Sequence, residues 1–158
     1  MHHEVLRRIE VTKNEELGYL DLSGLELTEI PTEILEVPWI GALSLSRNKI
    51  VDISMLSKMK QLHKLALTDN EIEEISVLGD MPKLRFIFLA DNKIKDISKI
   101  KGQERLKKLV LANNNISVVP DLSQFPLLVY LDLSGNHVDK TIVDRLKRTL
   151  PVLKILKI

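Results

Sequence analysis

The sequence has no cysteine, few aromatic residues and no long apolar run, and each absence narrows what the protein can be. Without cysteine among its 158 residues, it cannot form disulfides, thiolate metal sites or a cysteine nucleophile. The net charge of +1 gives no general preference for nucleic acid or an anionic membrane. Charged residues interrupt residues 1–16, unlike the apolar core of a secretory signal, and no window resembles a membrane span. We therefore expect a soluble, cytoplasmic protein.

Motifs that carry chemistry are missing as well. The six glycines are dispersed, so the sequence contains neither a phosphate-binding loop nor a dinucleotide fingerprint. Its four histidines lack the spacing of metal ligands. The acid pairs Glu15/Glu16 and Glu73/Glu74 are interpreted as solvated loop charge. We predict that the protein is not an enzyme and uses no cofactor or metal.

What the sequence does contain is a repeat. The segment LHKLALTDNEIEEI, residues 62–75, returns at residues 84–97 and 106–119, with flanking copies that begin at Ile40 and Leu128. Degenerate copies begin at Leu17 and Leu150. The fourth positions are separated by 23, 22, 22, 22, 22 and 22 residues, and they are Leu20, Leu43, Leu65, Ile87, Leu109, Leu131 and Leu153. A fixed period of this length is typical of a stacked solenoid.

The pattern LxxLxLxxNxIxxI resembles the leucine-rich repeat, in the 22-residue subclass seen in internalins and in a regulatory subunit of a nuclear protein phosphatase. The opening LDLSGLELTEIPTEI is also similar to the first repeats of bacterial leucine-rich repeat proteins. The resemblance implies a right-handed α/β solenoid with a concave parallel β-sheet and a convex side of 3₁₀ turns and loops. It also implies a protein-binding role and supplies no catalytic residue.

We predict one domain over residues 1–158. Residues 1–16 are expected to form a helical cap, residues 17–138 the repeats, and residues 139–158 a cap made of a helix and a strand, because terminal repeats must shield their apolar interior. An asparagine column should pair with the backbone of the inward turns, and it comprises Asn48, Asn70, Asn92, Asn114 and Asn136. We expect Trp39 to pack between the convex side and the core. Gln103 interrupts a column of apolar residues. Either neighbouring backbone satisfies its amide or its return segment bulges toward solvent, and we favour the bulge.

The alternation of a strand places the residue between the two leucines of each LxL on the concave face. Four of the six aromatic residues fall on outward positions, with Phe86 and Phe88 at the middle of the solenoid. An exposed apolar centre with a charged rim is typical of a partner-binding surface. The predicted partner-binding residues are Tyr19, Asp21, His63, Lys64, Arg85, Phe86, Phe88, Lys107, Lys108, Val110, Tyr130 and Asp132. The last outward positions are assigned to Val152 and Lys154.

We therefore predict a monomeric module that binds a protein, with an acidic or mixed surface, on the concave face. Phe86 and Phe88 could instead simply pack on each other and on the aliphatic parts of the Arg85 and Lys108 side chains, with nothing bound. Self-association through the same patch is one alternative function, and a scaffold segment of a larger multidomain protein is another. RNA binding would use the same rings and lysines. It is less favoured, because the net charge is near zero and Asp69 and Asp91 lie beside the patch.

Overall fold

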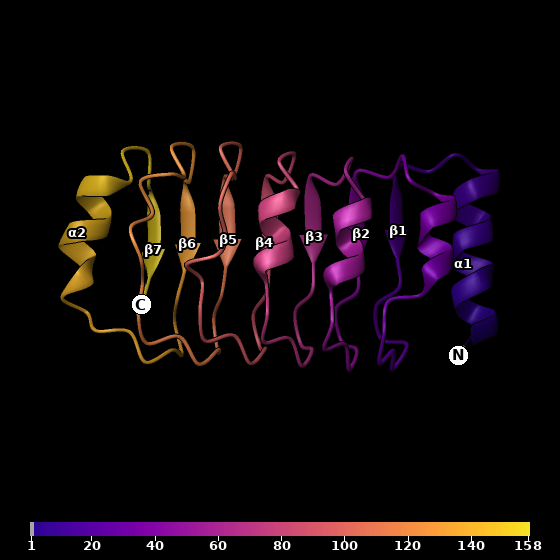
Figure 1. Ribbon diagram of the computed structural model, residues 1–158, viewed down its shortest axis with the longest axis horizontal. Coiled ribbons are helices and arrows are strands. Elements are labelled where there is room, and N and C mark those ends of the chain that lie inside the picture. Colours follow the sequence, from indigo (N-terminus) through magenta and orange to yellow (C-terminus); the bar gives the residue numbers. More distant parts are fainter. Residues whose placement is uncertain (1) are drawn as a thin grey trace.

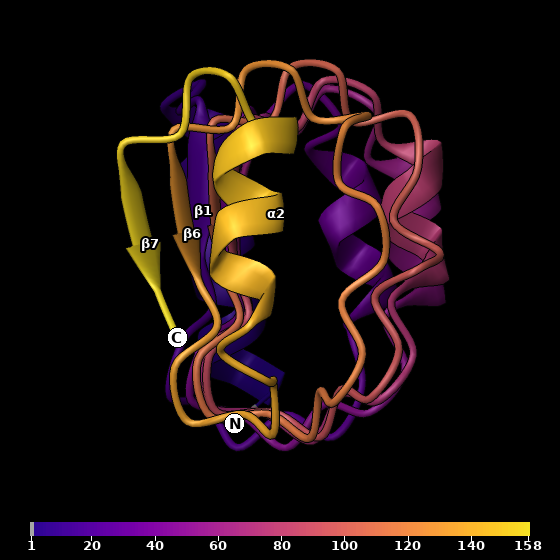
Figure 2. The ribbon, with the colours of Figure 1, turned by 90° about the vertical axis from the view of Figure 1, so that its left-hand side faces the viewer.

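Seven short strands form one parallel sheet in the computed structural model, which describes residues 2–158. They follow one another in chain order, and each pairs with its sequence neighbours (Figure 1). The strands are β1 (Tyr19–Asp21), β2 (Ala42–Ser44), β3 (Lys64–Ala66), β4 (Phe86–Phe88), β5 (Lys108–Val110), β6 (Tyr130–Asp132) and β7 (Ile155–Lys157). The sheet occupies one side of the coil and the return segments occupy the other (Figure 2). The predicted leucine-rich α/β solenoid is confirmed.

The register follows the predicted columns over the first six strands. Leu20, Leu43 and Leu65 lie side by side, and Ile87, Leu109 and Leu131 continue the row. All six side chains are buried, since the middle residue of each strand points into the coil. The last step is different. Leu131 pairs with Leu156 and not with Leu153, so the sequence-based register of the final strand is wrong by three residues.

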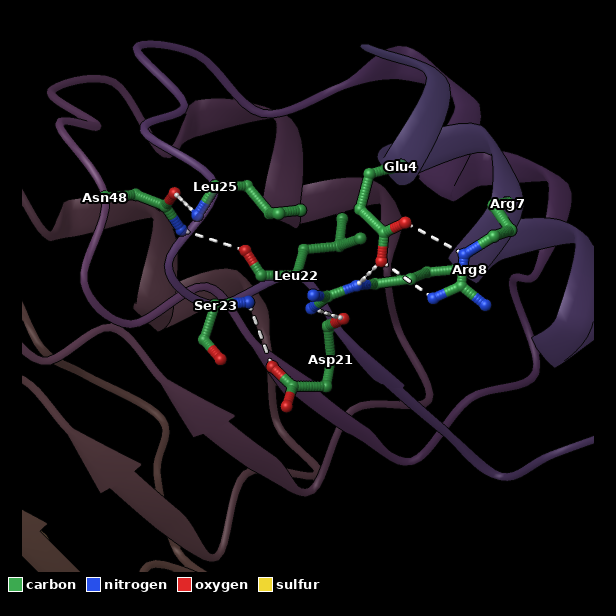
Figure 3. Close-up of polar contacts among 8 residues, drawn as sticks. All are labelled: Glu4, Arg7, Arg8, Asp21, Leu22, Ser23, Leu25 and Asn48. Atoms are coloured by element: carbon green, nitrogen blue, oxygen red, sulfur yellow. Dashed lines mark hydrogen bonds and ion pairs between the residues drawn. The ribbon is translucent and has the colours of Figure 1, made fainter. Parts of the chain in front are cut away.

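The asparagine column forms a continuous hydrogen-bonded spine. Asn92 Nδ2 donates to Leu67 O at 2.9 Å and Leu89 O at 3.2 Å, while its Oδ1 accepts from Ile72 N at 3.0 Å. Leu89 O also accepts from the next amide, Asn114 Nδ2, at 2.9 Å. At the first turn, Asn48 serves the backbone of the irregular opening repeat through Leu22 O and Leu25 N (Figure 3). These amides pair backbone groups that a tight inward turn would otherwise leave unsatisfied.

Helix α1 (His2–Asn14) closes the first end of the coil with Val5 and Ile9, which are buried. It also covers the open edge of β1, where Arg8 Nη1 donates to Asp21 O at 3.0 Å and Thr12 Oγ1 donates to Tyr19 O at 3.3 Å. Glu4 holds Arg8 in place through a 2.7 Å ion pair (Figure 3). Hydrogen bonds from Arg7 and then Arg8 lower the pKa of Glu4 to about 2. The cap therefore satisfies the edge strand as well as covering the core.

Helix α2 (Ile142–Thr149) closes the other end with buried Leu146, and Arg145 Nη2 donates to Val119 O at 2.7 Å. It lies against the end of the coil interior, while β7 stands to one side of it at the sheet edge (Figure 2). This helix occupies eight residues before the chain returns to the sheet. This longer return explains the shifted register of β7.

The return segments differ along the coil. The first three contain the 3₁₀ helices η1 (Thr32–Glu36), η2 (Ser54–Lys58) and η3 (Ser76–Asp80), as the resemblance implies. The fourth return has turns instead, with Gly102 at φ +71°. The prediction that this return bulges is wrong for Gln103, because its side chain is fully buried and Nε2 donates to Leu78 O. Gln103 Oε1 has no hydrogen-bond partner within residues 2–158.

Trp39 also departs from expectation. Its side chain is 43% exposed and does not pack between the convex side and the core. Indole Nε1 donates to Leu17 O at 3.1 Å, so the ring lies over the start of the first repeat. The indole N–H requires a partner, and a surface position beside a free carbonyl supplies one.

Candidate binding surface

The sheet face consists of the first and third side chains of the seven strands. Those positions point outward because the middle residue of each strand is inward. Within residues 2–158, no helix or strand lies over the sheet face: the returns lie behind the coil, and α1 and α2 lie at its ends (Figures 1 and 2). This is where the structure places the outward residues of the predicted binding surface.

A row of alternating cations and rings crosses five strands of the sheet face. The ammonium of Lys64 lies 5.9 Å from the centroid of the Phe88 ring, and that of Lys108 lies 5.3 Å from the same ring. Lys108 Nζ also lies 4.3 Å from the Tyr130 centroid, and Lys157 Nζ lies 5.6 Å from it. We call Lys64, Phe88, Lys108, Tyr130 and Lys157 the cation–ring row. Each contact is within the range of a cation–π attraction.

Phe86 lies beside this row, and we call its ring uncapped because no cation of the described residues lies over it. It pairs in register with Lys64 on β3 and with Lys108 on β5, yet both ammonium groups lie over Phe88. Within residues 2–158 no cation lies over the Phe86 ring. Val110, next to Phe88 in register, extends the apolar centre, and all three apolar side chains are half-buried. The two phenylalanines therefore have different surroundings, although they lie on one strand.

Three further basic residues border the row where the chain enters the strands. His63, Arg85 and Lys107 each precede a strand, and all three are exposed. The His63 ring lies against the backbone of Gly41, where an added Cβ would be 2.4 Å from Nε2. Glycine at position 41 thus leaves room for the imidazole on the neighbouring repeat.

The central cations of the sheet face lack acidic partners among the described residues, in contrast to those on the downstream edge. We define the downstream edge as the asparagine column together with the loops that follow each of its asparagines. There, Lys93 pairs with Glu71 at 2.8 Å, and Lys95 and Lys99 pair with Glu73 and Glu74. Among the described residues, no carboxylate lies within 4.0 Å of Lys64, Arg85, Lys107 or Lys108.

The charge of the chain is also divided along its length. Residues 80–158 contain 15 lysines and arginines against 8 acids, whereas residues 1–79 contain 8 against 14. Because the strands are stacked in chain order, this division in sequence is a division in space (Figure 1). The near-zero net charge conceals it.

Tyr19 and Asp21 lie apart from the central residues. They are on β1, and the small side chains of Ala42 and Ser44 on β2 separate them from Lys64. A shallow hollow of 330 Å³ lies here, and its lining includes Tyr19, Asp21, Ala42 and Lys64. Burial raises the pKa of Asp21, but hydrogen bonds from Ser23 outweigh it and leave that pKa below its ordinary value.

Asp132 has a local structural partner. It is 7% exposed, and its Oδ1 accepts from Ser134 N at 3.0 Å and from Ser134 Oγ at 2.6 Å. Its Oδ2 lies 3.9 Å from Lys157 Nζ. Tyr130, and more weakly Asp132, raises the pKa of Lys157 above its ordinary value. Asp132 thus orders a turn and anchors one end of the cation–ring row.

Lys157 and Ile155 are the surface residues that the sequence reasoning missed. It placed Val152 and Lys154 on the sheet face, whereas the register brings Ile155 beside Tyr130 and Lys157 beside Asp132. A signal was available, because the predicted terminal helix requires more chain than the other returns. The 22-residue period concealed the additional three residues.

Within residues 2–158, no three His, Asp or Glu side chains are grouped so as to hold a metal ion. In the same part of the chain, no helix has the length and apolar character needed to cross a membrane.

Comparison with known proteins now identifies the family. The family described as Leucine Rich repeats (2 copies) matches residues 60–102 and 104–147, more than half of the chain. The protein therefore belongs to the leucine-rich repeat family. Proteins of this family generally mediate protein–protein interactions. No curated protein matches the chain at a significant level.

Solved structures show the same architecture. An internalin (inlF) from Listeria monocytogenes has a TM-score of 0.75 and 27% identity, with 84% of this chain and 38% of the internalin covered. Internalin C2 from the same organism has a TM-score of 0.75 and 25% identity, over 83% and 56% of the two chains. The ectodomain of the receptor kinase SOBIR1 from Arabidopsis thaliana has a TM-score of 0.63 and 28% identity, over 75% and 69%. The chain thus spans less than two thirds of the length of either internalin.

Proposed function

We propose that this protein is a non-catalytic binding module that docks a protein partner on its sheet face. The observation that carries the proposal is the cation–ring row. Its members Lys64 and Lys108 have no carboxylate within 4.0 Å among the described residues, whereas the lysines of the downstream edge are paired. Unpaired cations around apolar rings complement an acidic partner surface with apolar side chains. Family membership supports a protein as the partner.

The size of the face supports the same proposal. Seven strands at about 4.8 Å spacing give roughly 30 Å of lateral surface, enough for an interface of about 800 Å² on each partner. At the centre, Phe86 and Phe88 are half-buried, and a ring that is desolvated further on docking gains about 25 cal/mol per Å². The exposed cations around them form a polar rim.

Affinity capture with a matched set of variants tests the proposal. The wild type, Phe86→Ala/Phe88→Ala, and the downstream-edge control Lys93→Ala/Lys95→Ala would be used as baits in extracts of the source organism. A fourth bait, Ile87→Val, weakens the core without changing the sheet face. We expect proteins bound by the wild type to be retained by both controls and lost from the phenylalanine variant. Undiminished capture by the phenylalanine variant would place the binding site elsewhere.

The uneven charge favours self-association as a second candidate function. The acidic residues of positions 1–79 could face the basic residues of positions 80–158 of another copy, head to tail. Such contacts between exposed charges weaken with salt. Sedimentation velocity in low and high salt tests this, and a monomer at high protein concentration in low salt would eliminate it.

A further inference from the structure

We infer that the cation–ring row binds an extended acidic segment in the polyproline II conformation, with a carboxylate at every third residue. This inference rests on the proposed function, because it specifies which part of a protein partner the sheet face would hold. It is carried by the spacing of the lysines, by the rings between them and by the lack of a neighbouring carboxylate at Lys64 and Lys108 among the described residues.

The lysines of the cation–ring row lie on alternate strands. Lys64 and Lys108 are the first residues of β3 and β5, and Lys157 is the third residue of β7, so each is two strands from the next. Lys157 therefore starts two residues further along its strand, but its ammonium lies 5.6 Å from the ring of Tyr130, which is the first residue of β6. At about 4.8 Å for each strand, successive lysines are about 9.6 Å apart along the direction that crosses the sheet. A ligand that follows this row must therefore present negative groups with a period of about 10 Å.

The polyproline II helix is a backbone conformation with that period. A polyproline II helix has three residues per turn and rises about 3.1 Å per residue, so residues i and i+3 share a face about 9.3 Å apart. In an extended β-strand, residues i and i+3 point to opposite faces. In an α-helix, the residues on one face with a similar period are i and i+7, about 10.5 Å apart. Contact with all three lysines would therefore need residues i, i+7 and i+14, which is about four turns of helix. The three lysines span about 19 Å, which seven residues of polyproline II cover.

Aromatic rings lie between the lysines of the row. Phe88 lies between Lys64 and Lys108, and Tyr130 lies between Lys108 and Lys157. Aromatic-lined surfaces bind proline-rich segments, because the polyproline II helix is already ordered and presents apolar rings without backbone hydrogen bonds of its own. The uncapped ring of Phe86, beside the row, offers a further apolar contact.

The charges around the row favour an acidic ligand. Lys64 and Lys108 have no carboxylate within 4.0 Å among the described residues, and Lys157 has only Asp132, at 3.9 Å. The exposed basic residues His63, Arg85 and Lys107 border the row on one side. On the other side, Asp69 and Asp91 follow β3 and β4 and would repel an acidic ligand. The ligand is thus confined to the row and its basic border.

Fluorescence anisotropy with synthetic peptides tests this arrangement. One labelled peptide has three Glu-Pro-Pro repeats, and a second has the same composition with its glutamates adjacent to one another. A third is an alanine-based helix with glutamate at every seventh residue, and a fourth probe is a uridine oligonucleotide. We expect the repeating peptide to bind at least about tenfold more tightly than the others and to weaken with added salt.

Two lysine variants locate the site. Lys108→Met removes the central charge and keeps an apolar stem, so we expect the repeating peptide to bind about tenfold more weakly. Lys93→Met makes the same change on the downstream edge and should leave binding unchanged. Thermal unfolding of both variants confirms that the fold is kept.

The outcomes separate this inference from the proposed function. Equal affinity for the repeating and adjacent-glutamate peptides, tighter binding of the helical peptide or the oligonucleotide, or no peptide binding at all would each overturn it. So would equal loss of affinity in Lys108→Met and Lys93→Met. None of these results bears on affinity capture by Phe86 and Phe88, which tests the proposed function by itself.

Discussion

The downstream edge and the sheet face share the same 22-residue period, but they differ in how far their side chains are paired and how far they vary from repeat to repeat. On the downstream edge, each ladder amide serves backbone groups of two successive repeats, and three lysines pair with glutamates of the preceding repeat. On the sheet face, the side chain at one position changes from Ser44 to Ala66, Phe88 and Val110 along the coil. A residue that pairs buried backbone groups is the same in every repeat, whereas a residue that faces solvent is free to differ between repeats.

The largest expected effect comes from breaking the asparagine spine. Asn114→Ala leaves Ile94 N without its acceptor and removes a second donor from Leu89 O and Leu111 O. Because one buried N–H loses its acceptor and two buried carbonyls each lose a donor, we expect a loss of about 3–5 kcal/mol in the free energy of unfolding, measured by urea denaturation. The matched control is Asn115→Ala, the same change one residue later at an exposed side chain, which should cost less than about 0.5 kcal/mol. Similar losses for the two variants would contradict the structural role of the column.

A second comparison uses two neighbours on β4. Ile87 is fully buried and Phe88 is half-buried on the sheet face. We expect Ile87→Ala to lower the free energy of unfolding by about 2–5 kcal/mol, because it leaves a cavity in a packed core. Phe88→Ala should cost only about 1–2 kcal/mol, from lost apolar burial and two cation–π contacts. Chemical denaturation of both variants measures the difference. A larger cost for Phe88→Ala would mean that this ring builds the coil.

The third substitution should raise the free energy of unfolding instead of lowering it. Gln103 occupies the inward column of Met59, Met81 and Phe125, and its Oε1 is buried without a partner. Leu78 O already accepts from Met81 N at 3.2 Å, so removing the Gln103 amide leaves that carbonyl paired. We expect Gln103→Met to raise the free energy of unfolding by about 1 kcal/mol. A loss of stability on thermal or urea unfolding would show that the amide has a needed partner.

The smallest effect should appear in acid. Asp52 and Asp121 begin return segments, and hydrogen bonds from the N–H and then the hydroxyl of Ser54 and Ser123 lower the pKa of each carboxyl. A carboxyl with a lowered folded-state pKa stabilises the fold above its unfolded pKa of about 3.9, and this contribution is lost as the pH falls through the folded value. We expect the thermal midpoint to fall below about pH 4.

The double variant Asp52→Asn/Asp121→Asn should reduce this acid dependence. The exposed pair Asp69→Asn/Asp91→Asn changes the same number of carboxyls next to the sheet face and serves as its control. An unchanged pH profile in the first variant would mean that these turns do not contribute to the acid response.

Much of the fold could be predicted, because repeated letters mark positions where every turn has the same requirement. The inward leucines, the strands and the asparagine spine follow from this, and the structure has them where the period places them for six strands. The predictions failed where one repeat is unlike the rest. Gln103 was expected outside because an amide is costly to bury, but the neighbouring turns hold the backbone in place and its side chain points inward.

The candidate surface was predictable only in part. Alternation within a strand is enough to place Phe86 and Phe88 outward, whereas it does not say which cation lies over which ring. Lys64 and Lys108 both turn toward Phe88 and leave Phe86 uncapped, and this depends on side-chain packing across three strands. The binding role of the predicted residues stays a prediction, and the variants above are its tests.

The sequence by itself determined the coil, because a 22-residue period of inward leucines and asparagines has one way to bury its apolar side chains and pair its backbone. Only the tertiary structure decided how the coil ends. Helix α2 takes additional chain, so Lys157 and not Lys154 reaches the sheet face and completes the cation–ring row beside Tyr130. A local pattern fixes what each turn needs, but the length of a cap is fixed by the open end that it must cover.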